Sequence, residues 1–145
     1  MSKHLMSVVH VMLVQEEQVL LLKRRNTGHH DGKYALPAGR LEPGEEVHMA
    51  AIREAEEECG VKIAREDLRM VCVMQIRTPD SERIDFFFTA GQWTGEPWNR
   101  EPEKCGELGW YPLNGLPENT ISYVRSALDR HRQGEWFFNC GYSEG

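Results

Sequence analysis

The sequence predicts an α/β fold, a sandwich of helices against a mixed β-sheet, in a single domain over residues 1–145. Strand-like apolar runs occur early in the chain and again after its middle. A helix-like segment without Gly or Pro lies between these runs, and a second helical pattern follows near the end. No internal repeat or linker rich in Gly, Ser or Pro divides the chain, and its length suits one domain.

The first strands are expected near the N-terminus. Val8–Val14 is almost wholly apolar, a polar break covers residues 15–17, and Val19–Leu22 is apolar again. Two apolar runs with a short polar break indicate a hairpin or adjacent strands. The segment Asn26–Gly39 is rich in Gly, His and Asp, so we expect a loop with one short strand at Tyr34–Leu36.

The middle of the chain predicts a helix followed by two strands. Glu45–Cys59 contains many Ala and Glu, and Gly60 lies where a left-handed C-terminal cap is expected. Leu68–Ile76 and Ile84–Ala90 are strand-like, and the Thr-Pro-Asp-Ser stretch between them has a turn composition.

The last third predicts less regular structure. Residues 91–106 are expected to be irregular, and Trp110 and Tyr111 to lie on a short strand. A second helix is expected from Asn119 to Arg132, with Asn119 as its N-cap and Gly134 just past its end.

Composition narrows the class of ligand and the compartment. The formal net charge of −6 argues against a broad surface for nucleic-acid polymers, which requires many Lys and Arg. A small phosphorylated ligand remains compatible with this charge when carboxylates hold a divalent cation. Four separated cysteines without a CxxC pair suggest reduced thiols. The stretch Met1–Ser7 lacks signal-peptide features, and no long apolar run suggests a membrane span, so a cytoplasmic location is expected.

Three glutamates on the central helix form an unusual pattern. Glu54, Glu57 and Glu58 fall within a stripe about 100° wide, where like charges repel by a few tenths of a kcal/mol per pair. Such a stripe becomes favourable when a hard cation sits among the carboxylates, and Mg²⁺ prefers oxygen ligands. A solvated acidic helix face is the alternative interpretation.

The residues around the stripe extend the pattern. The stretch Gly39–Val61 resembles the Nudix box, G-x5-E-x7-R-E-U-x-E-E-x-G-U, in which U is an apolar residue. The positions of the box are filled in register by Gly39, Glu45, Arg53, Glu54, Ala55, Glu57, Glu58, Gly60 and Val61. The sequence before and after the box also resembles Nudix hydrolases of the MutT type, which implies an α/β/α sandwich with a mixed sheet.

The resemblance implies a role for each charged residue of the box. Glu54, Glu57 and Glu58 match the carboxylates that bind metal, and the carbonyl of Gly39 is a further expected ligand. Mg²⁺ is the expected cofactor, with Mn²⁺ as an alternative. One of the glutamates is expected to activate the attacking water, although the sequence does not separate the base from the metal ligands. Arg53 is expected to orient these glutamates.

Outside the box, the resemblance suggests an additional acid from a later loop, and Glu103 and Glu107 are the candidates, with Glu107 preferred. A surface position is the alternative for each. Side chains at the end of an early strand are candidates for phosphate contact, and aromatic residues are candidates for holding the base. Arg24 and Arg25 are the candidates for phosphate contact, and Tyr34, Phe88 and Trp110 are the candidates for holding the base. Core packing is the alternative for the aromatic residues.

The expected reaction is hydrolysis of a nucleoside triphosphate, including an oxidised or modified one, to the monophosphate and pyrophosphate. A nucleotide sugar such as ADP-ribose is the alternative substrate. A non-catalytic Nudix-like domain and a small acidic structural protein are the remaining alternatives. The expected partner is a small-molecule nucleotide, with no nucleic-acid polymer and no membrane, and the chain is expected to act as a monomer or homodimer.

Overall fold

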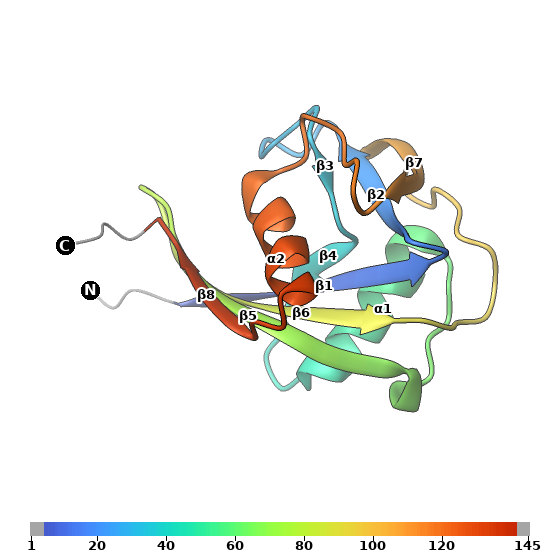
Figure 1. Cartoon of the computed structure of the whole chain (residues 1–145), viewed down its shortest axis with the longest axis horizontal. Helices are drawn as coiled ribbons and strands as arrows, with labels where there is room; N and C mark the ends of the chain where they lie inside the picture. The colour runs from blue at the N-terminus through green and yellow to red at the C-terminus, as the bar shows by residue number, and fades with distance from the viewer. Residues whose placement is uncertain (1–4, 142–145) are drawn as a thin grey trace.

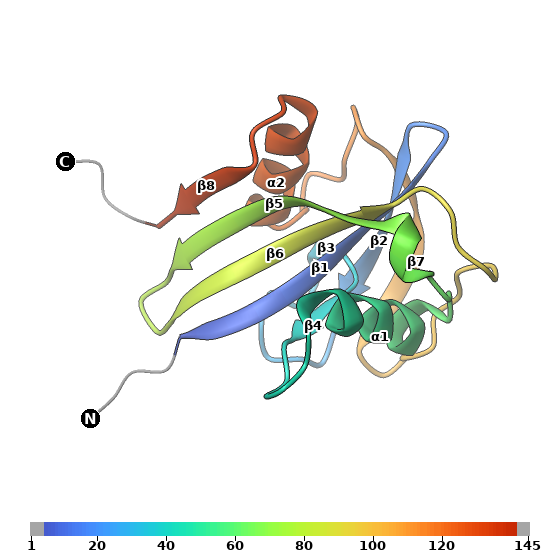
Figure 2. The same cartoon turned by 90° about the horizontal axis from the view of Figure 1, so that it is seen from below.

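A computed structural model describes residues 5–141, so most of the Met1–Ser7 stretch lies outside the described residues. A mixed sheet separates one helix on each face (Figures 1 and 2). The described elements are the strands β1 (Met6–Gln15), β2 (Gln18–Arg24), β3 (Tyr34–Ala35), β4 (Ala38–Arg40), β5 (Leu68–Arg77), β6 (Glu82–Ala90), β7 (Cys105–Pro112) and β8 (Phe137–Cys140), the helices α1 (Val47–Cys59) and α2 (Ser122–Arg132), and the short 3₁₀ helix η1 (Arg65–Asp67).

Strand β1 organises the sheet. In the described part of the chain the strand order is β3-β2-β1-β6-β5-β8, with β4 also paired to β1 and β7 to β2. The β1–β6 and β5–β8 pairs are parallel and the other named pairs are antiparallel. The expected early hairpin is confirmed, since Val14 of β1 pairs with Val19 of β2. The prediction of a mixed sheet in an α/β/α sandwich is also confirmed.

Each face of the sheet has its own apolar core. Val9 and Val11 of β1 pack with Ala51 and Ala55 of α1, while Met12 packs on the α2 side. Alternate residues of β1 therefore serve opposite cores, which explains why the run is apolar throughout. Small residues on the buried face of α1 let this helix lie close to the sheet, and its acidic stripe contacts β4.

Several predicted boundaries were wrong. Strand β7 begins at Cys105, inside the stretch that was expected to be irregular, and strands β4 and β8 were not predicted. These strands are short or polar, and their pairing with distant strands is what defines them. Gly60 is confirmed as the left-handed C-cap of α1, with φ of 73°, and Gly134 follows the C-cap of α2 with φ of 78°.

The start of α2 also differs from the prediction. The helix begins at Ser122, and Ile121 occupies the N-cap position that was expected for Asn119. The Asn119 side-chain amide instead donates to the Gly32 carbonyl at 2.7 Å, and Tyr34 N–H donates to the Asn119 carbonyl at 3.0 Å. These contacts with an earlier loop hold Asn119 outside the helix.

No helix within residues 5–141 combines the length and apolar character needed to cross a membrane. The four cysteines are free: Cys59, Cys72 and Cys105 are buried, and Cys140 is partly buried.

Candidate active site

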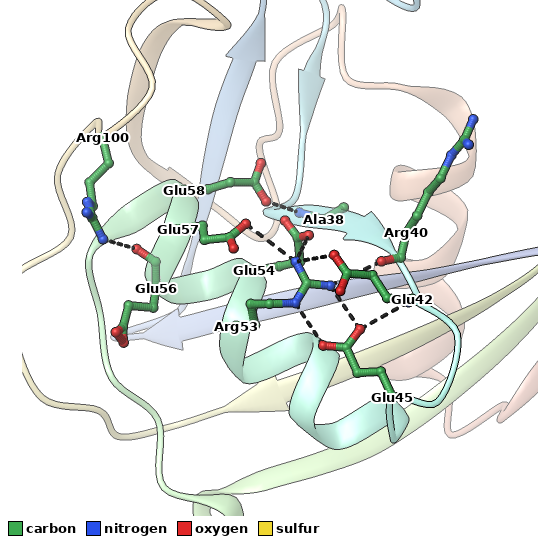
Figure 3. Close-up of polar contacts among 10 residues, drawn as sticks. All are labelled: Ala38, Arg40, Glu42, Glu45, Arg53, Glu54, Glu56, Glu57, Glu58 and Arg100. Atoms are coloured by element: carbon green, nitrogen blue, oxygen red, sulfur yellow. Dashed lines mark hydrogen bonds and ion pairs between the residues drawn. The ribbon is translucent and has the colours of Figure 1, made fainter.

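Strand β4 and helix α1 meet at the glutamate stripe (Figure 3). A side chain at Gly39 would displace the Glu54 carboxyl group, so glycine at this position keeps Glu54 close to β4. The neighbouring Ala38 N–H donates to Glu58 Oε2 at 2.8 Å. The strand therefore fixes two of the three glutamates from outside the helix.

Glu54, which is buried, and Glu58, which is partly buried, form a pair of acidic side chains. Burial raises the pKa of Glu54, and hydrogen bonds from Arg53 only partly oppose this shift. Burial also raises the pKa of Glu58 well above its ordinary value, and the adjacent Glu54 charge adds to the shift. This pair carries an unfavourable negative charge that a bound cation would relieve.

Arg53 connects the acidic residues. Its Nε donates to Glu45 Oε2 at 2.8 Å and its Nη2 to Glu45 Oε1 at 3.0 Å. Its Nη1 donates to Glu54 Oε1 at 2.7 Å and reaches Glu57 Oε2 at 3.4 Å. The hydrogen bonds from Arg53 lower the pKa of Glu45. Arg53 thus contacts the glutamates in the manner that the sequence suggested.

The loop after β6 covers the C-terminal end of α1. Trp98 N–H donates to the Cys59 carbonyl at 3.0 Å, and Arg100 N–H donates to the Glu58 carbonyl at 3.3 Å. The Arg100 side chain donates to the Glu56 carbonyl at 2.9 Å. A side chain at Gly60 would collide with the Trp98 ring. The loop therefore satisfies carbonyls that a helix end leaves without partners.

This docking brings Glu101 to the site, a residue that the sequence reasoning missed. Glu101 directly follows Arg100, and its negative charge contributes to the raised pKa values of Glu58 and Cys59. The available signal was only its position in an acidic loop, a feature that it shares with Glu103.

The two predicted loop acids have other contacts. Glu107 lies on β7, where its Oε2 accepts a hydrogen bond from Tyr34 at 2.9 Å and its Oε1 accepts one from Tyr111 at 3.4 Å. Glu103 is exposed, and its backbone carbonyl accepts a hydrogen bond from Asn26. The structure thus directs Glu107 toward two tyrosines, and Glu101 is the loop acid whose chain neighbour Arg100 bonds to the Glu58 carbonyl.

The two candidate phosphate arginines contact loops of the protein. Arg24 donates from Nε to the His29 carbonyl at 2.8 Å and from Nη2 to Thr27 Oγ1 at 3.2 Å. Arg25 donates from Nε to the Pro102 carbonyl at 2.8 Å. The guanidinium donors that could bond to a phosphate are therefore used in hydrogen bonds within the protein.

The three candidate aromatic residues lie in different environments. Phe88 is fully buried in the core on the α1 side, with its ring edge-to-face to His48 at 4.9 Å between centroids. Trp110 is partly buried and stacks on Trp93 at 5.9 Å between centroids. Tyr34 is buried and bonds to Glu107. The structure therefore leaves Trp110 with the most accessible ring of the three.

The donor set fits a hard divalent cation. Glu54, Glu57 and Glu58 supply carboxylate oxygens on one side of α1, and the Gly39 backbone lies against Glu54. Within residues 5–141, no three His, Cys, Asp or Glu side chains converge as a ready-made metal site. Arg53 occupies oxygens of Glu54 and Glu57 that such a cation would share. The chemistry of the ligands, oxygen only and with excess negative charge, nevertheless suits Mg²⁺.

Comparison with known proteins places this geometry in a family. A family model described as NUDIX domain matches residues 3–131. The chain is 29% identical to an 8-oxo-dGTP diphosphatase of Escherichia coli over 114 residues, which cover 79% of this chain and 84% of the relative. It is 30% identical to an ADP-ribose pyrophosphatase of Methanocaldococcus jannaschii over 121 residues, or 83% of this chain and 70% of that protein.

A solved structure gives the same result. The crystal structure of a MutT NUDIX hydrolase from Burkholderia pseudomallei superposes with a TM-score of 0.81 and 29% identity, covering 88% of this chain and 98% of that chain. The acidic helix, the strand that contacts it and these relatives agree: the chain belongs to the Nudix hydrolase family.

Proposed function

We propose that this protein is a Mg²⁺-dependent Nudix hydrolase that cleaves a nucleoside triphosphate, including an oxidised one, to the nucleoside monophosphate and pyrophosphate. The observation that carries this proposal is the gathering of Glu54, Glu57 and Glu58 beside β4, where the pKa values of Glu54 and Glu58 are raised and a bound cation would compensate the carboxylate charge. The half-exposed Glu57 adds a carboxylate at the solvent side of the pair. The similarity to an 8-oxo-dGTP diphosphatase supports the choice of a triphosphate.

Each residue of the site has a task in this reaction. Glu54, Glu57 and Glu58, with the Gly39 carbonyl, would hold Mg²⁺, or Mn²⁺ in its place. When bound, the cation neutralises phosphate oxygens and acidifies water. Arg53 keeps the carboxylates in place through its hydrogen bonds to Glu54 and Glu57.

Hydrolysis transfers a proton from water to the protein and releases pyrophosphate. One of the buried glutamates accepts a proton from a water molecule as the water oxygen bonds to phosphorus. The bond from this phosphorus to the bridging oxygen breaks, and pyrophosphate leaves. A base must be ionised to accept this proton, and a bound cation would favour the ionised forms of Glu54 and Glu58 over the protonated forms that burial favours.

The nucleoside end of the substrate is proposed to contact residues of β2, β3 and β7. Trp110 and Tyr34 would hold the base, with Phe88 supporting the site from within the core. Arg24 would contact phosphate after releasing the His29 carbonyl. Glu107 is the proposed additional acid at the metal, and it would take this role after its hydrogen bond from the Tyr34 hydroxyl breaks. We also propose that the enzyme acts on free nucleotides in the cytoplasm, as a monomer or homodimer.

The competing substrate is ADP-ribose or another nucleotide sugar, because a relative of 30% identity carries that name. A product-resolved assay with Mg²⁺ distinguishes the two proposals. Canonical and oxidised nucleoside triphosphates are expected to give the monophosphate and pyrophosphate, and chelation by EDTA is expected to abolish both products. Turnover of ADP-ribose alone would transfer the activity to the nucleotide-sugar class. The absence of turnover for every nucleotide and nucleotide sugar with Mg²⁺ or Mn²⁺ would contradict catalysis itself.

A further inference from the structure

The loop that carries Glu101 is attached to the protein at two ends. One end, Trp98 and Arg100, docks on the last carbonyls of α1, as described above. The other end is held by Arg25, which follows β2. Arg25 N–H donates to the Lys104 carbonyl at 2.9 Å, its Nε donates to the Pro102 carbonyl at 2.8 Å, and its Nη2 donates to the same carbonyl.

Between these attachments the loop forms a compact turn around Glu101. Asn99 Oδ1 accepts the Glu101 N–H at 3.1 Å, and Asn99 Nδ2 donates to the Cys105 carbonyl at 2.8 Å. The Glu101 carbonyl accepts the N–H groups of Lys104 at 2.9 Å and Cys105 at 2.8 Å. The backbone of Glu101 is therefore fixed on both sides, and its orientation depends on where Pro102 and Lys104 are held.

We propose that Arg25 is a positioning residue, which holds the Pro102–Lys104 side of the loop so that Glu101 stays beside the end of α1, where the N–H of the preceding Arg100 donates to the Glu58 carbonyl. The proposal rests on the cation-binding role of the Glu54–Glu58 pair given under Proposed function. Arg25 fits the role because a guanidinium offers several donors in one plane, and two of them reach one carbonyl. The Arg25 Cδ atom lies 3.4 Å from the position that a Cβ atom on Gly106 would take, so the arginine lies against β7, the strand that follows the loop.

The test compares Arg25→Met and Arg25→Lys with Arg69→Met, which removes the same charge from an exposed position on β5. Glu101→Gln and the double variant Arg25→Met/Glu101→Gln complete the set. Two quantities are measured: Mn²⁺ affinity of the substrate-free protein by electron paramagnetic resonance, and the kcat and nucleotide KM with Mg²⁺. Thermal unfolding of each variant checks that the fold is retained.

Arg25→Met is expected to weaken Mn²⁺ binding and lower kcat by about tenfold to a hundredfold, as for residues that support a metal site from outside its ligands, while KM stays within about twofold. Arg25→Lys is expected to lie between Arg25→Met and wild type, because one donor to Pro102 remains. Arg69→Met is expected to match wild type. In the Glu101→Gln background, removal of the arginine is expected to add no further loss, because Arg25 acts through Glu101.

Three outcomes would overturn the proposal. The first is a loss in the double variant equal to the product of the two single losses. The second is a change in KM without a change in Mn²⁺ affinity, which would indicate direct substrate contact by Arg25. The third is wild-type metal affinity for Arg25→Lys when Arg25→Met does not fold. Failure of the proposed function is distinct from these, since the wild-type protein itself would then bind no Mn²⁺ at the cluster and cleave no nucleotide.

Discussion

Buried charges lie on both sides of the sheet, and the two clusters are built in opposite ways. On the α1 side, Glu54 is buried and Glu58 is partly buried, and the pKa of each carboxyl group is raised, mainly by burial. On the α2 side, Asp85 accepts hydrogen bonds from His10 Nε2 at 2.8 Å and from Arg83 at 3.1 and 3.0 Å. Burial disfavours the Asp85 charge, but His10 and Arg83 together hold its pKa below the ordinary value.

The difference separates stability from function. In the Asp85 cluster, His10 from β1 and Arg83 from β6 donate hydrogen bonds to the carboxylate, so groups of the folded protein stabilise its negative charge. The glutamate cluster is only partly balanced by Arg53, and its remaining negative charge favours a cation from outside. The comparison predicts that changes in the first cluster affect mainly stability and changes in the second affect mainly turnover.

The largest expected effect is on turnover. Replacement of Glu57 or Glu58 by Gln removes a proposed metal ligand or base and is expected to lower kcat by roughly a hundredfold to ten-thousandfold. The unfolding midpoint is expected to stay within about 2 °C of wild type or to rise, because a repelling charge is lost. Steady-state kinetics with Mg²⁺ and thermal unfolding measure the two effects.

The matched control is Glu56→Gln, since Glu56 lies on the same helix and its side chain points away from the cluster (Figure 3). This variant is expected to retain wild-type turnover. Equal losses for Glu56→Gln and Glu57→Gln would show that helix charge, rather than the placement of the carboxylates, determines activity, and the contrast between the two clusters would fail.

A large effect on stability is expected at the balanced cluster. Asp85→Asn leaves Arg83 and His10 without their charged partner in a buried position, and the free energy of unfolding is expected to fall by about 3–5 kcal/mol. Urea unfolding measures this loss, with Asp80→Asn in the exposed turn between β5 and β6 as the control. Turnover per folded molecule is expected to be unchanged. Loss of turnover in the folded variant would place Asp85 in the active site instead.

The smallest expected effect is the acid dependence of the same cluster. Because the folded-state pKa of Asp85 is depressed, its contribution to stability is present above the unfolded-state pKa, about 4, and is lost as pH falls through the lower folded-state value. The difference in unfolding free energy between wild type and Asp85→Asn is therefore expected to persist at pH 5 and to shrink below about pH 4. A difference that grows as the pH falls in this range would contradict the assigned direction.

The main parts of the site followed from local sequence, because the glutamates and Arg53 belong to one helix. Helix periodicity alone places Glu54, Glu57 and Glu58 on one stripe, and Gly60 ends the helix where it was expected. The contact between Gly39 and Glu54 also agrees with the motif spacing, since β4 directly precedes α1 along the chain. The mixed sheet was predicted from the alternation of strand and helix patterns.

Contacts between distant segments were decided only by the tertiary structure. The sequence offered several acids in the loop before β7, and docking of Trp98 and Arg100 on α1 brings Glu101 nearer to the helix end than its position in the sequence could show. The Arg25 side chain, one of the candidates for phosphate contact, bonds to the Pro102 carbonyl, a partner that local sequence did not indicate. His10 and Asp85 are 75 residues apart and meet because β1 and β6 pair in parallel. A local pattern encodes which residues share a helix face, whereas partners across loops and strands depend on the register and packing of the whole fold.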